Sequence, residues 1–392
     1  MTIGTLGAEV SALQASSDGC ANSKSKVLRK GHTTGACAAI AASAATRMLF
    51  LKKEPIDSSI RLPNGSSLTL PVEDCSINGD RARCAVRKDA GDDPDVTNGH
   101  LVYAEVELIE DEGIEIEGGE GIGRVTRKGL DQAVGEYAIN TVPRRMISES
   151  VISVLNSNGH HGGARVIISI PGGEQIAQRT FNPRLGITGG LSILGTTGIV
   201  EPMSENAIIE TVKAEMNIQV AEGIKHLVVT PGNYGASYVS MMPTLDKERI
   251  IKCSNFIGET IDHASRLDAE SLLIVGNVGK LVKIAAGIMN THSRYADGRM
   301  EVIASHAAMA SASKDDVKAI MECVTTDDAL ELVDRLGLLI PTTESILDRI
   351  GFHLSYRAGP DLDIGAVMHS SKYGLLGTTE GADRIIDQHR RA

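Results

Sequence analysis

The stretch SLLIVGNVGKLVKIAAGIM, residues 271–289, contains the signals of a strand, a loop and a helix in direct succession. The run Ser271–Val275 has the length and the β-branched content of a buried strand. The loop Gly276–Lys280 follows it, and the apolar spacing of Leu281–Met289 predicts a helix. Short apolar strands that alternate with helices are typical of a parallel sheet with helices packed on its faces.

The same order of elements occurs twice upstream of this stretch. A predicted strand at His226–Thr230 precedes the loop Pro231–Gly235 and a short helix. A second predicted strand at Ile250–Cys253 precedes the loop Ser254–Gly258 and another helix. A helix from its N-cap Ser204 to Gly223 is expected before these units. After them we expect a mainly helical segment that reaches Leu339, a helix at Thr343–Tyr356 and a strand at Asp363–His369. We therefore expect an α/β domain with a Rossmann-like parallel sheet over residues 201–392.

The chain before residue 201 has a different pattern. The Ala-rich segment Thr33–Phe50 predicts a long helix that starts at Thr33 or Thr34, both good N-cap residues. Beyond it, the sequence predicts a hairpin at Ile60–Leu70, strands at Ala82–Arg87, Leu101–Leu108 and Ala164–Ile170, and helices near Leu130–Glu136 and Pro143–Leu155. These elements indicate an α+β domain over residues 27–200, with a mixed or antiparallel sheet. Residues 1–26, rich in Ser, Ala and Gly, are expected to form a disordered tail.

The composition limits the classes of partner. Aromatic residues make up 3% of the 392 residues and Trp is absent, so a stacking platform for nucleic-acid bases is not expected. The formal net charge of −11 argues against general affinity for nucleic acid or for an anionic membrane. A basic pocket for an anionic small molecule is compatible with this total charge.

The cysteine pattern and the absence of targeting signals indicate the cytoplasm. No pair among the six cysteines has C-x-x-C spacing, which leaves a zinc ribbon or a redox motif unsupported. The N-terminus lacks a basic region followed by an apolar run, and no apolar stretch reaches the roughly 20 residues of a membrane span. We expect a cytoplasmic protein with reduced thiols, and a homo-oligomer is compatible with the sequence.

Three loops are candidates for a nucleotide-like cofactor site. Residues 231–235, 254–258 and 276–280 each follow a predicted parallel strand, so all three fall at the carboxyl edge of the sheet. Ligands bind at this edge because helix N-termini offer free N–H groups there and glycines allow close approach of the backbone. Ordinary βα turns have the same composition and remain the alternative. None of the loops matches G-x-G-x-x-G or the P-loop pattern.

Four further segments are dense in polar side chains. The segment 287–299 contains imidazole, guanidinium and carboxylate groups that can bind an anion or transfer a proton. The glycine-rich segment 118–129, with the Arg144–Arg145 pair, offers guanidinium groups that match carboxylates. The segment 182–204 combines glycines with hydroxyls, which fit a ligand with many oxygens. The aspartates of segment 88–99 lack the spacing of a calcium loop, so we interpret them as a turn or a substrate loop. Solvated turns and connections remain the alternative for each segment.

These segments, in this order, resemble the CbiD family of cobalamin-pathway methyltransferases. The matching pieces cover nearly all of the chain from about Val27: LRKGHTTGACAAIAA (28–42), KDAGDDPDVTNG (88–99), GGEGIGRVTRKGL (118–130), AINTVPRRMI (138–147), FNPRLGITGGLSILGTTGIVEPMSE (181–205), TPGNYG (230–235), KCSNFIGETID (252–262), VGNVGKLVKIAAGIMNTHSRYADGRME (275–301) and HSSKYGLLG (369–377). So many long motifs in a fixed order are highly specific. His32 stands where the resemblance leads us to expect Tyr or Phe, which affects only the role of this side chain.

The resemblance implies that S-adenosylmethionine donates a methyl group to carbon 1 of cobalt-precorrin-5B, giving cobalt-precorrin-6A in anaerobic cobalamin (vitamin B12) biosynthesis. The cobalt belongs to the substrate, so no protein-bound metal is expected. A substrate edged with carboxylates requires a local basic pocket, and methyl transfer requires mainly the alignment of donor and acceptor. Two alternatives stay open: an NAD(P)-dependent tetrapyrrole oxidoreductase, and a non-catalytic protein that binds anionic tetrapyrroles.

With this resemblance, the candidate residues take expected roles. Residues 27–200 are expected to bind the substrate and residues 201–392 the cofactor, across one shared cleft. The expected cofactor-binding residues are Pro231, Gly232, Asn233, Gly235, Gly276, Asn277, Gly279 and Lys280. The expected substrate-binding residues are Thr33, Thr34, Arg124, Arg127, Arg144, Arg145, Arg184, Thr196, Thr197 and Arg294. The candidates for a catalytic base are His292, Asp297 and Glu201.

Overall fold

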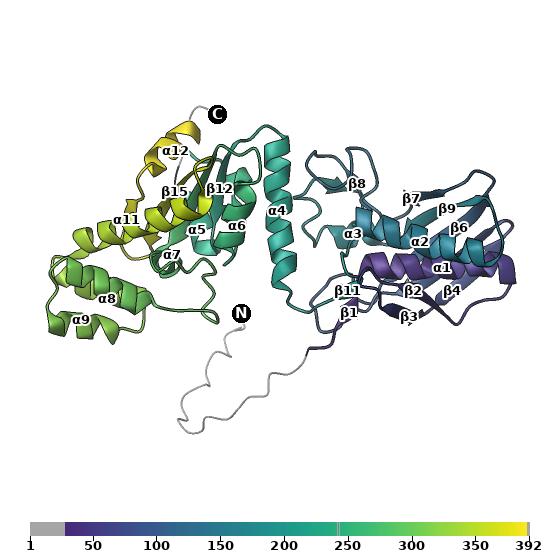
Figure 1. Cartoon of the computed structure of the whole chain (residues 1–392), viewed down its shortest axis with the longest axis horizontal. Coiled ribbons are helices and arrows are strands. Elements are labelled where there is room, and N and C mark those ends of the chain that lie inside the picture. Colours follow the sequence, from purple (N-terminus) through teal and green to yellow (C-terminus); the bar gives the residue numbers. More distant parts are fainter. Residues whose placement is uncertain (1–27, 241, 243, 390–392) are drawn as a thin grey trace, which may run out of the picture.

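The computed structural model describes residues 28–240, 242 and 244–389, so the tail expected over residues 1–26 lies outside the described residues. The helices and strands form two groups on either side of helix α4 (Glu205–Ala221), each with its own five-stranded sheet (Figure 1). Each group also has its own large hydrophobic core. The mixed α and β composition predicted from the sequence is confirmed.

The first sheet is mixed, which is one of the two forms, mixed or antiparallel, that the sequence predicts for this part of the chain. Its strand order is β4-β5-β6-β9-β7, in which β7 and β9 are parallel and the other neighbours antiparallel. Its strands are β4 (Glu73–Asn78), β5 (Arg81–Arg87), β6 (Leu101–Ile109), β7 (Ile114–Gly118) and β9 (Gly163–Ser169). The expected hairpin is formed by β2 (Asp57–Arg61) and β3 (Ser67–Pro71), which pair in antiparallel register.

Helix α1 (Thr34–Leu51) forms the centre of the first core. Thr33 is its N-cap, and the Thr33 Oγ1 accepts a hydrogen bond from the Ala36 N–H. Most of its residues are alanines or other small residues that are buried, which lets the helix pack closely against the sheet and against α2 (Thr141–Ser157). Among the described helices, α1 alone is long and apolar enough to cross a membrane, but 83% of it is buried inside the protein.

The second sheet contains the strands of the predicted strand–loop–helix units. Its order is β13-β12-β14-β15-β16. The strands β12 (His226–Thr230), β13 (Ile251–Lys252), β14 (Ser271–Asn277) and β15 (Asp363–Ser370) run parallel. β16 (Gly374–Thr378) adds an antiparallel edge that the sequence patterns do not predict.

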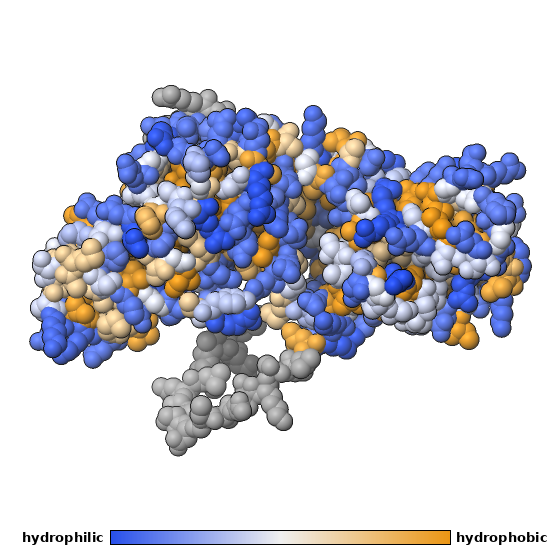
Figure 2. Space-filling model, in the orientation of Figure 1, coloured by the Kyte–Doolittle hydropathy of each residue, from blue (hydrophilic) through white to orange (hydrophobic). Residues whose placement is uncertain are grey.

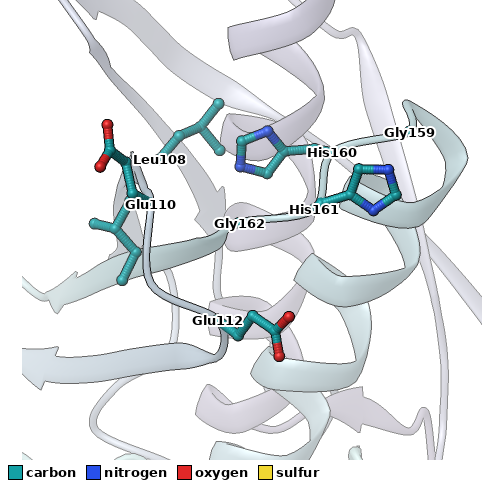
Figure 3. A pocket seen from close by; sticks show the side chains of 8 residues that line it. Leu108, Glu110, Glu112, Gly159, His160, His161 and Gly162 are labelled. Atoms are coloured by element: carbon teal, nitrogen blue, oxygen red, sulfur yellow. The ribbon is translucent and has the colours of Figure 1, made fainter.

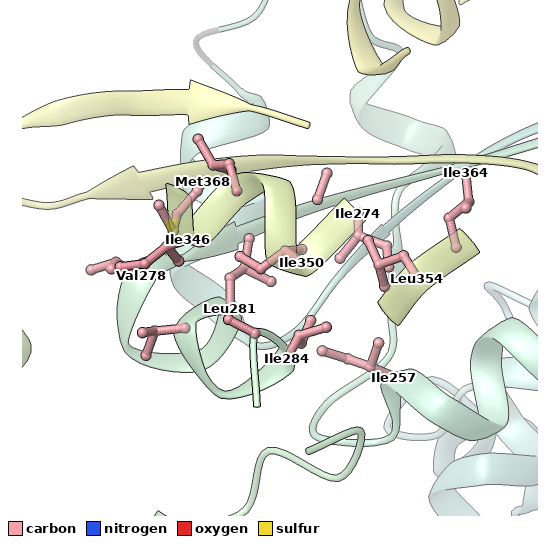
Figure 4. Packing of buried hydrophobic residues seen from close by; sticks show 14 of the residues in the cluster. Ile257, Ile274, Val278, Leu281, Ile284, Ile346, Ile350, Leu354, Ile364 and Met368 are labelled. Carbon is pink, nitrogen blue, oxygen red and sulfur yellow. The ribbon is translucent and has the colours of Figure 1, made fainter. Parts of the chain in front are cut away.

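Helices cover both faces of this second sheet. α6 (Ile257–Ala264), α7 (Val278–Ile284) and α11 (Leu339–Ala358) pack on one face, where their apolar side chains interleave with those of the strands (Figure 4). α5 (Asn233–Val239) and α12 (Ala382–His389) pack on the other face. Because successive residues of a strand point to opposite sides, the three central strands β12, β14 and β15 contribute to the apolar clusters on both faces.

The helix predicted near Leu130–Glu136 is not formed, and this prediction was wrong. The segment consists of turns and bends. Gly129 and Gly135 adopt positive φ angles of 94° and 93°, so the backbone reverses at both ends of the segment. The residues between these two glycines are too few for a helix to be stable without strong packing.

Short elements connect the two groups and complete the fold. They are β1 (Gly31–His32), β8 (Arg124–Val125), β10 (Ile187–Thr188), β11 (Ile199–Val200), α3 (Gly173–Ala177), the 3₁₀ helix Lys247–Arg249, α8 (Arg299–Met309), α9 (Lys314–Met321) and α10 (Thr326–Arg335). β1 pairs with β11, and β8 pairs with β10. These pairings hold the polar segment 182–204 against the start of α1 and against the glycine-rich segment 118–129.

Candidate functional site

The carboxyl edge of the second sheet contains a topological switch point. β12 and β14 are parallel neighbours, but α5 follows β12 on one face of the sheet and α7 follows β14 on the other. Chains that leave adjacent strands toward opposite faces open a crevice at the strand ends, where ligands of α/β proteins bind. Two of the predicted cofactor loops, 231–235 and 276–280, form this crevice.

The first residues of these two loops are in contact. A Cβ atom placed on Gly276 would lie 3.0 Å from Pro231 Cγ, and one placed on Gly232 would lie 3.4 Å from Lys280 Cε. Gly232 also has a φ of 97°, which favours glycine at this position. The four residues therefore lie together at the strand ends, as the sequence leads us to expect.

The remaining predicted cofactor residues shape the same loops. A Cβ atom on Gly235 would lie 2.4 Å from the Val275 carbonyl oxygen, so the start of α5 can approach β14 only because this residue is glycine. Asn277 is the N-cap of α7, and its Oδ1 accepts a hydrogen bond from the Gly279 N–H at 2.9 Å. Asn233 is the first residue of α5.

Lys280 carries a positive charge at this crevice and forms no ion pair with a carboxylate of the described residues. Its Nζ donates to Asn255 Oδ1, a neutral amide oxygen of the loop 254–258. Burial lowers the pKa of Lys280, because partial removal from water disfavours the charged form. A half-buried cation with a neutral protein partner can pair with an anionic group of a ligand.

The polar segment 287–299 packs against the loop 254–258. The Thr291 N–H donates to the Asn255 carbonyl oxygen at 3.0 Å, and the Thr291 Oγ1 lies 3.3 Å from Asn255 Oδ1. This is the same amide oxygen that Lys280 contacts, so the segment lies at the same edge of the sheet. His292 follows directly and is exposed.

The immediate partners of His292 and Asp297 limit their use as bases. His292 Nδ1 accepts the Arg294 N–H at 3.0 Å, so the neutral ring carries its proton on Nε2 and presents a donor. The Arg299 guanidinium, 2.5 Å from Asp297, holds the pKa of that carboxyl below its usual range. The buried Lys283 ammonium lies 3.9 Å from the same carboxylate. Asp297 therefore balances neighbouring cations.

Glu201, the third candidate for a base, lies in another part of the molecule. It is exposed, and its carboxylate lies 2.7 Å from Lys30 Nζ. The hydrogen bond from Lys30 lowers the pKa of Glu201. Within the described residues, no contact brings Glu201 to His292 or Asp297.

Three of the predicted substrate arginines form ion pairs with carboxylates of α4 and of the residue that follows it. The pairs are Arg127–Glu222 at 2.6 Å, Arg184–Glu215 at 2.9 Å and Arg294–Glu205 at 3.1 Å. Arg127 and Arg184 belong to the first group of elements, so their pairs attach this group to α4. Arg184 also donates to the Ile250 carbonyl oxygen at 2.5 Å. The protein itself already compensates these three charges.

The other three predicted arginines have different surroundings. Arg124 lies over the Tyr137 ring, with its Cζ 3.8 Å from the ring centre. Arg144 donates to two backbone carbonyl oxygens, at 2.9 and 3.0 Å. Arg145 is exposed, and its contact with Glu149 is a loose 4.0 Å. Arg145 is therefore exposed and only loosely paired, whereas the likewise exposed Arg294 is held by Glu205.

The predicted threonines gather at the start of α1. The Leu194 N–H donates to Thr34 Oγ1 at 3.0 Å, and the Thr33 N–H donates to the Gly198 carbonyl oxygen at 3.0 Å. The pair Thr196–Thr197 lies between these two contacts and therefore beside the same helix end. The structure thus places the predicted substrate and cofactor residues in two regions. Figure 2 shows a mainly hydrophilic face that is hollowed beside α4, and no described contact joins the threonines to the crevice across it.

The sequence patterns missed a charged layer next to these threonines. Lys88 is 2% exposed, and its Nζ lies 2.9 Å from Asp95 Oδ2. The Arg29 guanidinium forms an ion pair with Asp89, and the Arg29 backbone N–H donates to Asp92 Oδ2 at 2.8 Å. The segment 88–99 therefore folds as a turn against the start of α1. The only signal in the sequence is the complementary charge of the two segments.

Two surface pockets of the described residues lie away from both regions and contain none of the predicted site residues. The first, of about 650 Å³, lies between the end of β6 and the residues before β9 and includes His160, His161, Glu110 and Glu112 (Figure 3). The second, of about 860 Å³, lies between α8 and α11 and includes Met309 and Phe352. Neither pocket is lined by residues of the glycine loops that the sequence predicts as a cofactor site.

Metal and thiol chemistry find little support in the described part of the chain. It holds no group of three or more His, Cys, Asp or Glu residues that could bind a metal. Burial raises the pKa of the Cys37 and Cys253 thiols to about 12, so neither is a thiolate at neutral pH.

Two family models match the chain. The model described as CbiD matches residues 21–202, and the model described as CbiD, C-terminal domain, matches residues 290–380. The matched segments include the start of α1, the loop 88–99, the segment 182–202 and the polar segment from Asn290 onward.

Several curated proteins are similar over most of the chain. A protein of Ruminiclostridium cellulolyticum named cobalt-precorrin-5B C(1)-methyltransferase is 50% identical over 343 residues, which is 88% of this chain and 89% of that protein. Proteins of the same name from Alkaliphilus metalliredigens and Thermoanaerobacter sp. are 42% and 44% identical, over 92% and 90% of this chain and 95% of each relative. The crystal structure of a cobalamin biosynthesis protein (cbiD) from Archaeoglobus fulgidus is 31% identical, covering 68% of this chain and 83% of that one, with a TM-score of 0.37.

Proposed function

The chain belongs to the CbiD family, and we propose on this premise that it methylates carbon 1 of cobalt-precorrin-5B to give cobalt-precorrin-6A, with S-adenosylmethionine as the methyl donor. The observation that carries the proposal is the match to relatives of this name along nearly the full length of both chains. The reaction is a step of anaerobic cobalamin biosynthesis, and the corrinoid substrate brings its own cobalt.

The proposed donor site is the switch-point crevice of a Rossmann-like domain over residues 201–392. Its residues are Pro231, Gly232, Asn233, Gly235, Gly276, Asn277, Gly279 and Lys280. The donor has a carboxylate at its amino-acid end, and the half-buried Lys280, with only a neutral amide partner, fits that group. The glycines allow the backbone to approach a ligand closely. When bound, the donor supplies an activated methyl group on a sulfonium sulfur.

The proposed substrate site lies in an α+β domain over residues 27–200, at the start of α1. Thr33, Thr34, Thr196 and Thr197 line this region. Two large separate cores and two separate sheets support the division into two domains. Arg124 and Arg145 lie on the same side of α4 as these threonines and are both exposed; Arg124 has no carboxylate partner among the described residues, and Arg145 has only the 4.0 Å contact with Glu149. Arg127, Arg144, Arg184 and Arg294 would have to exchange their present partners in order to bind substrate.

The chain contributes to the reaction mainly by position. Methyl transfer from a sulfonium to an electron-rich carbon gains most from holding the two reactants at attack distance. Among the three candidates for proton transfer, His292 is exposed beside the donor loops, whereas Asp297 and Glu201 are paired with cations that weaken them as bases. Because its Nε2–H is a donor, we assign His292 the donation of a proton or of a hydrogen bond to a substrate carboxylate.

Two other functions are less well supported. An NAD(P)-dependent tetrapyrrole oxidoreductase would use the same crevice, and a carrier would bind the tetrapyrrole without turnover. The names of the relatives favour methyl transfer over both. We also propose a soluble cytoplasmic enzyme, and the burial of α1 inside the protein fits the soluble form.

The proposal is tested by titration and by product analysis. Isothermal titration of the full chain should show binding of S-adenosylhomocysteine and none of NADPH. Mass spectrometry of the corrinoid after incubation with S-adenosylmethionine should show the gain of one methyl group. Binding of NADPH alone would favour the oxidoreductase, and binding of corrinoid without a mass change would favour the carrier.

A further inference from the structure

Three adjacent strands end in polar residues on the face of the second sheet that α5 covers. The apolar cluster on this face includes one valine from each strand: Val228 of β12, Val275 of β14 and Val367 of β15. Because side chains alternate along a strand, the residues two positions further on, Thr230, Asn277 and His369, point to the same side. Asn277 and His369 are also direct neighbours in the pairing of β14 with β15. A polar row therefore borders the switch-point crevice.

Two members of this row have a buried atom without a hydrogen-bond partner in the described structure. These atoms are Thr230 Oγ1 and His369 Nε2. Thr230 has no exposed surface, and His369 is 3% exposed. Asn277, in contrast, is paired with the Gly279 N–H. Buried polar atoms of native proteins are almost always paired, because an unpaired one destabilises the fold. The described residues hold seven such atoms, and Thr230 Oγ1 and His369 Nε2 are the two that lie at strand ends of the second sheet. Their position beside the switch point indicates a ligand that forms hydrogen bonds with both.

Helix α5 covers both unpaired atoms. A Cβ atom on Gly235 would lie 3.0 Å from Thr230 Cβ, so the first turn of α5 rests on the threonine. The Tyr238 ring stacks on the His369 ring, with centroids 4.3 Å apart and an angle of 2° between the planes. The stack fixes the plane of the imidazole and therefore the direction of Nε2. A ligand reaches the two atoms only when α5 shifts.

We propose that Thr230 and His369 bind the nucleoside part of the methyl donor, while Lys280 binds its carboxylate. This assignment rests on the proposed function, because it divides one donor molecule between two sides of the crevice. The hydroxyl of Thr230 and the imidazole of His369 are uncharged groups that suit ribose hydroxyls and adenine nitrogens. Lys280, on the α7 side, is the charged group. Burial lowers the pKa of His369, which keeps its ring neutral at pH 7.

The assignment fixes how the donor crosses the switch point. Its amino-acid end lies on the α7 side, beside Gly232 and Asn255, which both adjoin Lys280. Its nucleoside end lies on the α5 side, over β12 and β15. The sulfur that joins the two ends is then held between the loops after β12 and β14. Binding in this direction requires α5 to move, so it couples donor binding to the helix that carries Tyr238.

Thr230 offers a test in which stability and binding change in opposite directions. Thr230→Val keeps the shape of the side chain and removes the unpaired hydroxyl, so the melting temperature of the apo protein should stay equal or rise. The affinity for S-adenosylhomocysteine, measured by isothermal titration, should fall about tenfold, the loss expected for one hydrogen bond to a ligand. Thr230→Ser keeps the hydroxyl and should bind nearly as tightly as the wild type.

His369 is tested with two replacements and two fragments of the donor. His369→Phe keeps the stacked ring without Nε2 and should lose about tenfold in affinity for adenosine and for S-adenosylhomocysteine. His369→Gln places an amide near the position of Nε2 and should recover most of this loss. Lys280→Met should weaken S-adenosylhomocysteine but leave adenosine unchanged. Tyr356→Phe, at a tyrosine that is 82% exposed on α11, is the matched control and should bind like the wild type.

Amide hydrogen exchange of residues 233–239 with and without S-adenosylhomocysteine provides the third readout. If S-adenosylhomocysteine changes the exchange rates of these amides, the result supports the shift of α5. If the rates are the same with and without it, the proposal is overturned. Thr230→Val and His369→Phe variants that fold and bind S-adenosylhomocysteine as tightly as the wild type also overturn it. A wild-type protein that binds no S-adenosylhomocysteine overturns the proposed function instead, which separates the two failures.

Discussion

Two lysines illustrate how the two regions of the molecule differ. Lys88, beside the start of α1, is 2% exposed and lies 2.9 Å from the Asp95 carboxylate. Lys280, at the edge of the second sheet, is half-buried and has only the amide oxygen of Asn255 as a partner. A buried charge with its counterion belongs to the fold, because removal of either partner leaves the other uncompensated. A half-buried charge without a counterion is available to a ligand.

The same contrast holds for the uncharged groups of the two regions. Around α1, Thr33 caps the helix and Thr34 bonds to the Leu194 backbone, so their hydroxyls are used by the fold. At the second sheet, Thr230 and His369 keep unpaired atoms under α5. The threonine hydroxyls of the first region are therefore used by the fold, and one buried atom beside them, His32 Nδ1, is unpaired. The second region differs because two unpaired atoms lie at adjoining strand ends, where a ligand can bond to both. The following predictions test this comparison, from the largest expected effect to the smallest.

Asp95→Asn should destabilise the protein most. The change leaves the Lys88 ammonium buried without a counterion, which costs about 3–5 kcal/mol of unfolding free energy. Urea denaturation followed by circular dichroism measures this loss. Asp80→Asn, in the exposed turn between β4 and β5, is the matched control and should change stability little. A variant with unchanged stability would show that the Lys88–Asp95 pair is not part of the fold.

Acid denaturation gives an independent measure of the same pair. Burial by itself raises the pKa of Asp95, but hydrogen bonds from Lys88 and Thr97 bring it below the ordinary value. The carboxylate therefore stabilises the folded state fully above its unfolded pKa, about 3.9, and this contribution is lost as the pH falls through the lower folded pKa. The Asp95→Asn variant should show a smaller loss of stability in this acid range than the wild type.

Lys280→Met should weaken donor binding without weakening the fold. An ion pair or charged hydrogen bond contributes about 1.5–3 kcal/mol, so the affinity for S-adenosylhomocysteine should fall roughly 10-fold to 100-fold. The melting temperature should stay equal or rise, because the variant no longer buries part of an unpaired cation. Lys314→Met, at the exposed start of α9, is the control for the loss of one charge. Unchanged affinity would remove Lys280 from the donor site.

Arg184→Met should affect the fold more than substrate binding. The change leaves Glu215, 9% exposed, without its ion pair to Arg184, at a cost of about 1–3 kcal/mol. Burial already raises the pKa of Glu215, so its protonated form favours the folded state and this benefit is lost as the pH rises through the folded pKa. The variant should therefore be less destabilised near pH 5 than near pH 8 in thermal unfolding. A rise in KM without any loss of stability would instead return Arg184 to the substrate site.

Arg145→Ala should have the smallest effect on stability, within about 0.5 kcal/mol, because an exposed 4.0 Å contact contributes little. If Arg145 binds the carboxylates of the substrate, KM for the corrinoid should rise while kcat stays near the wild-type value. Steady-state kinetics at two salt concentrations measures this rise, which should be larger at low salt. An unchanged KM at both concentrations would exclude Arg145 from the substrate site.

The sequence predicted the strands of the second sheet well because their signals are local. His226–Thr230 and Ser271–Val275 are short apolar runs bounded by glycine loops, and each appears as a strand at almost the predicted position. The helix near Leu130–Glu136 failed because the left-handed φ of Gly129 and Gly135 overrides the weak helical pattern between them. The antiparallel strand β16 has no comparable pattern and depends on pairing with β15.

The sequence by itself determined the parallel sheet, the long helix α1 and the glycine loops at the strand ends, because helix and strand periods and turn chemistry act between near neighbours. The tertiary structure alone decided which charged side chains form ion pairs within the protein and which are left for a ligand. Arg127, Arg184 and Arg294 look equivalent to Lys280 in sequence, but only folding brings carboxylates of α4 and of Glu222 to the arginines and leaves the lysine with an amide. Ion pairs form through space between distant segments, so no local pattern can reveal them.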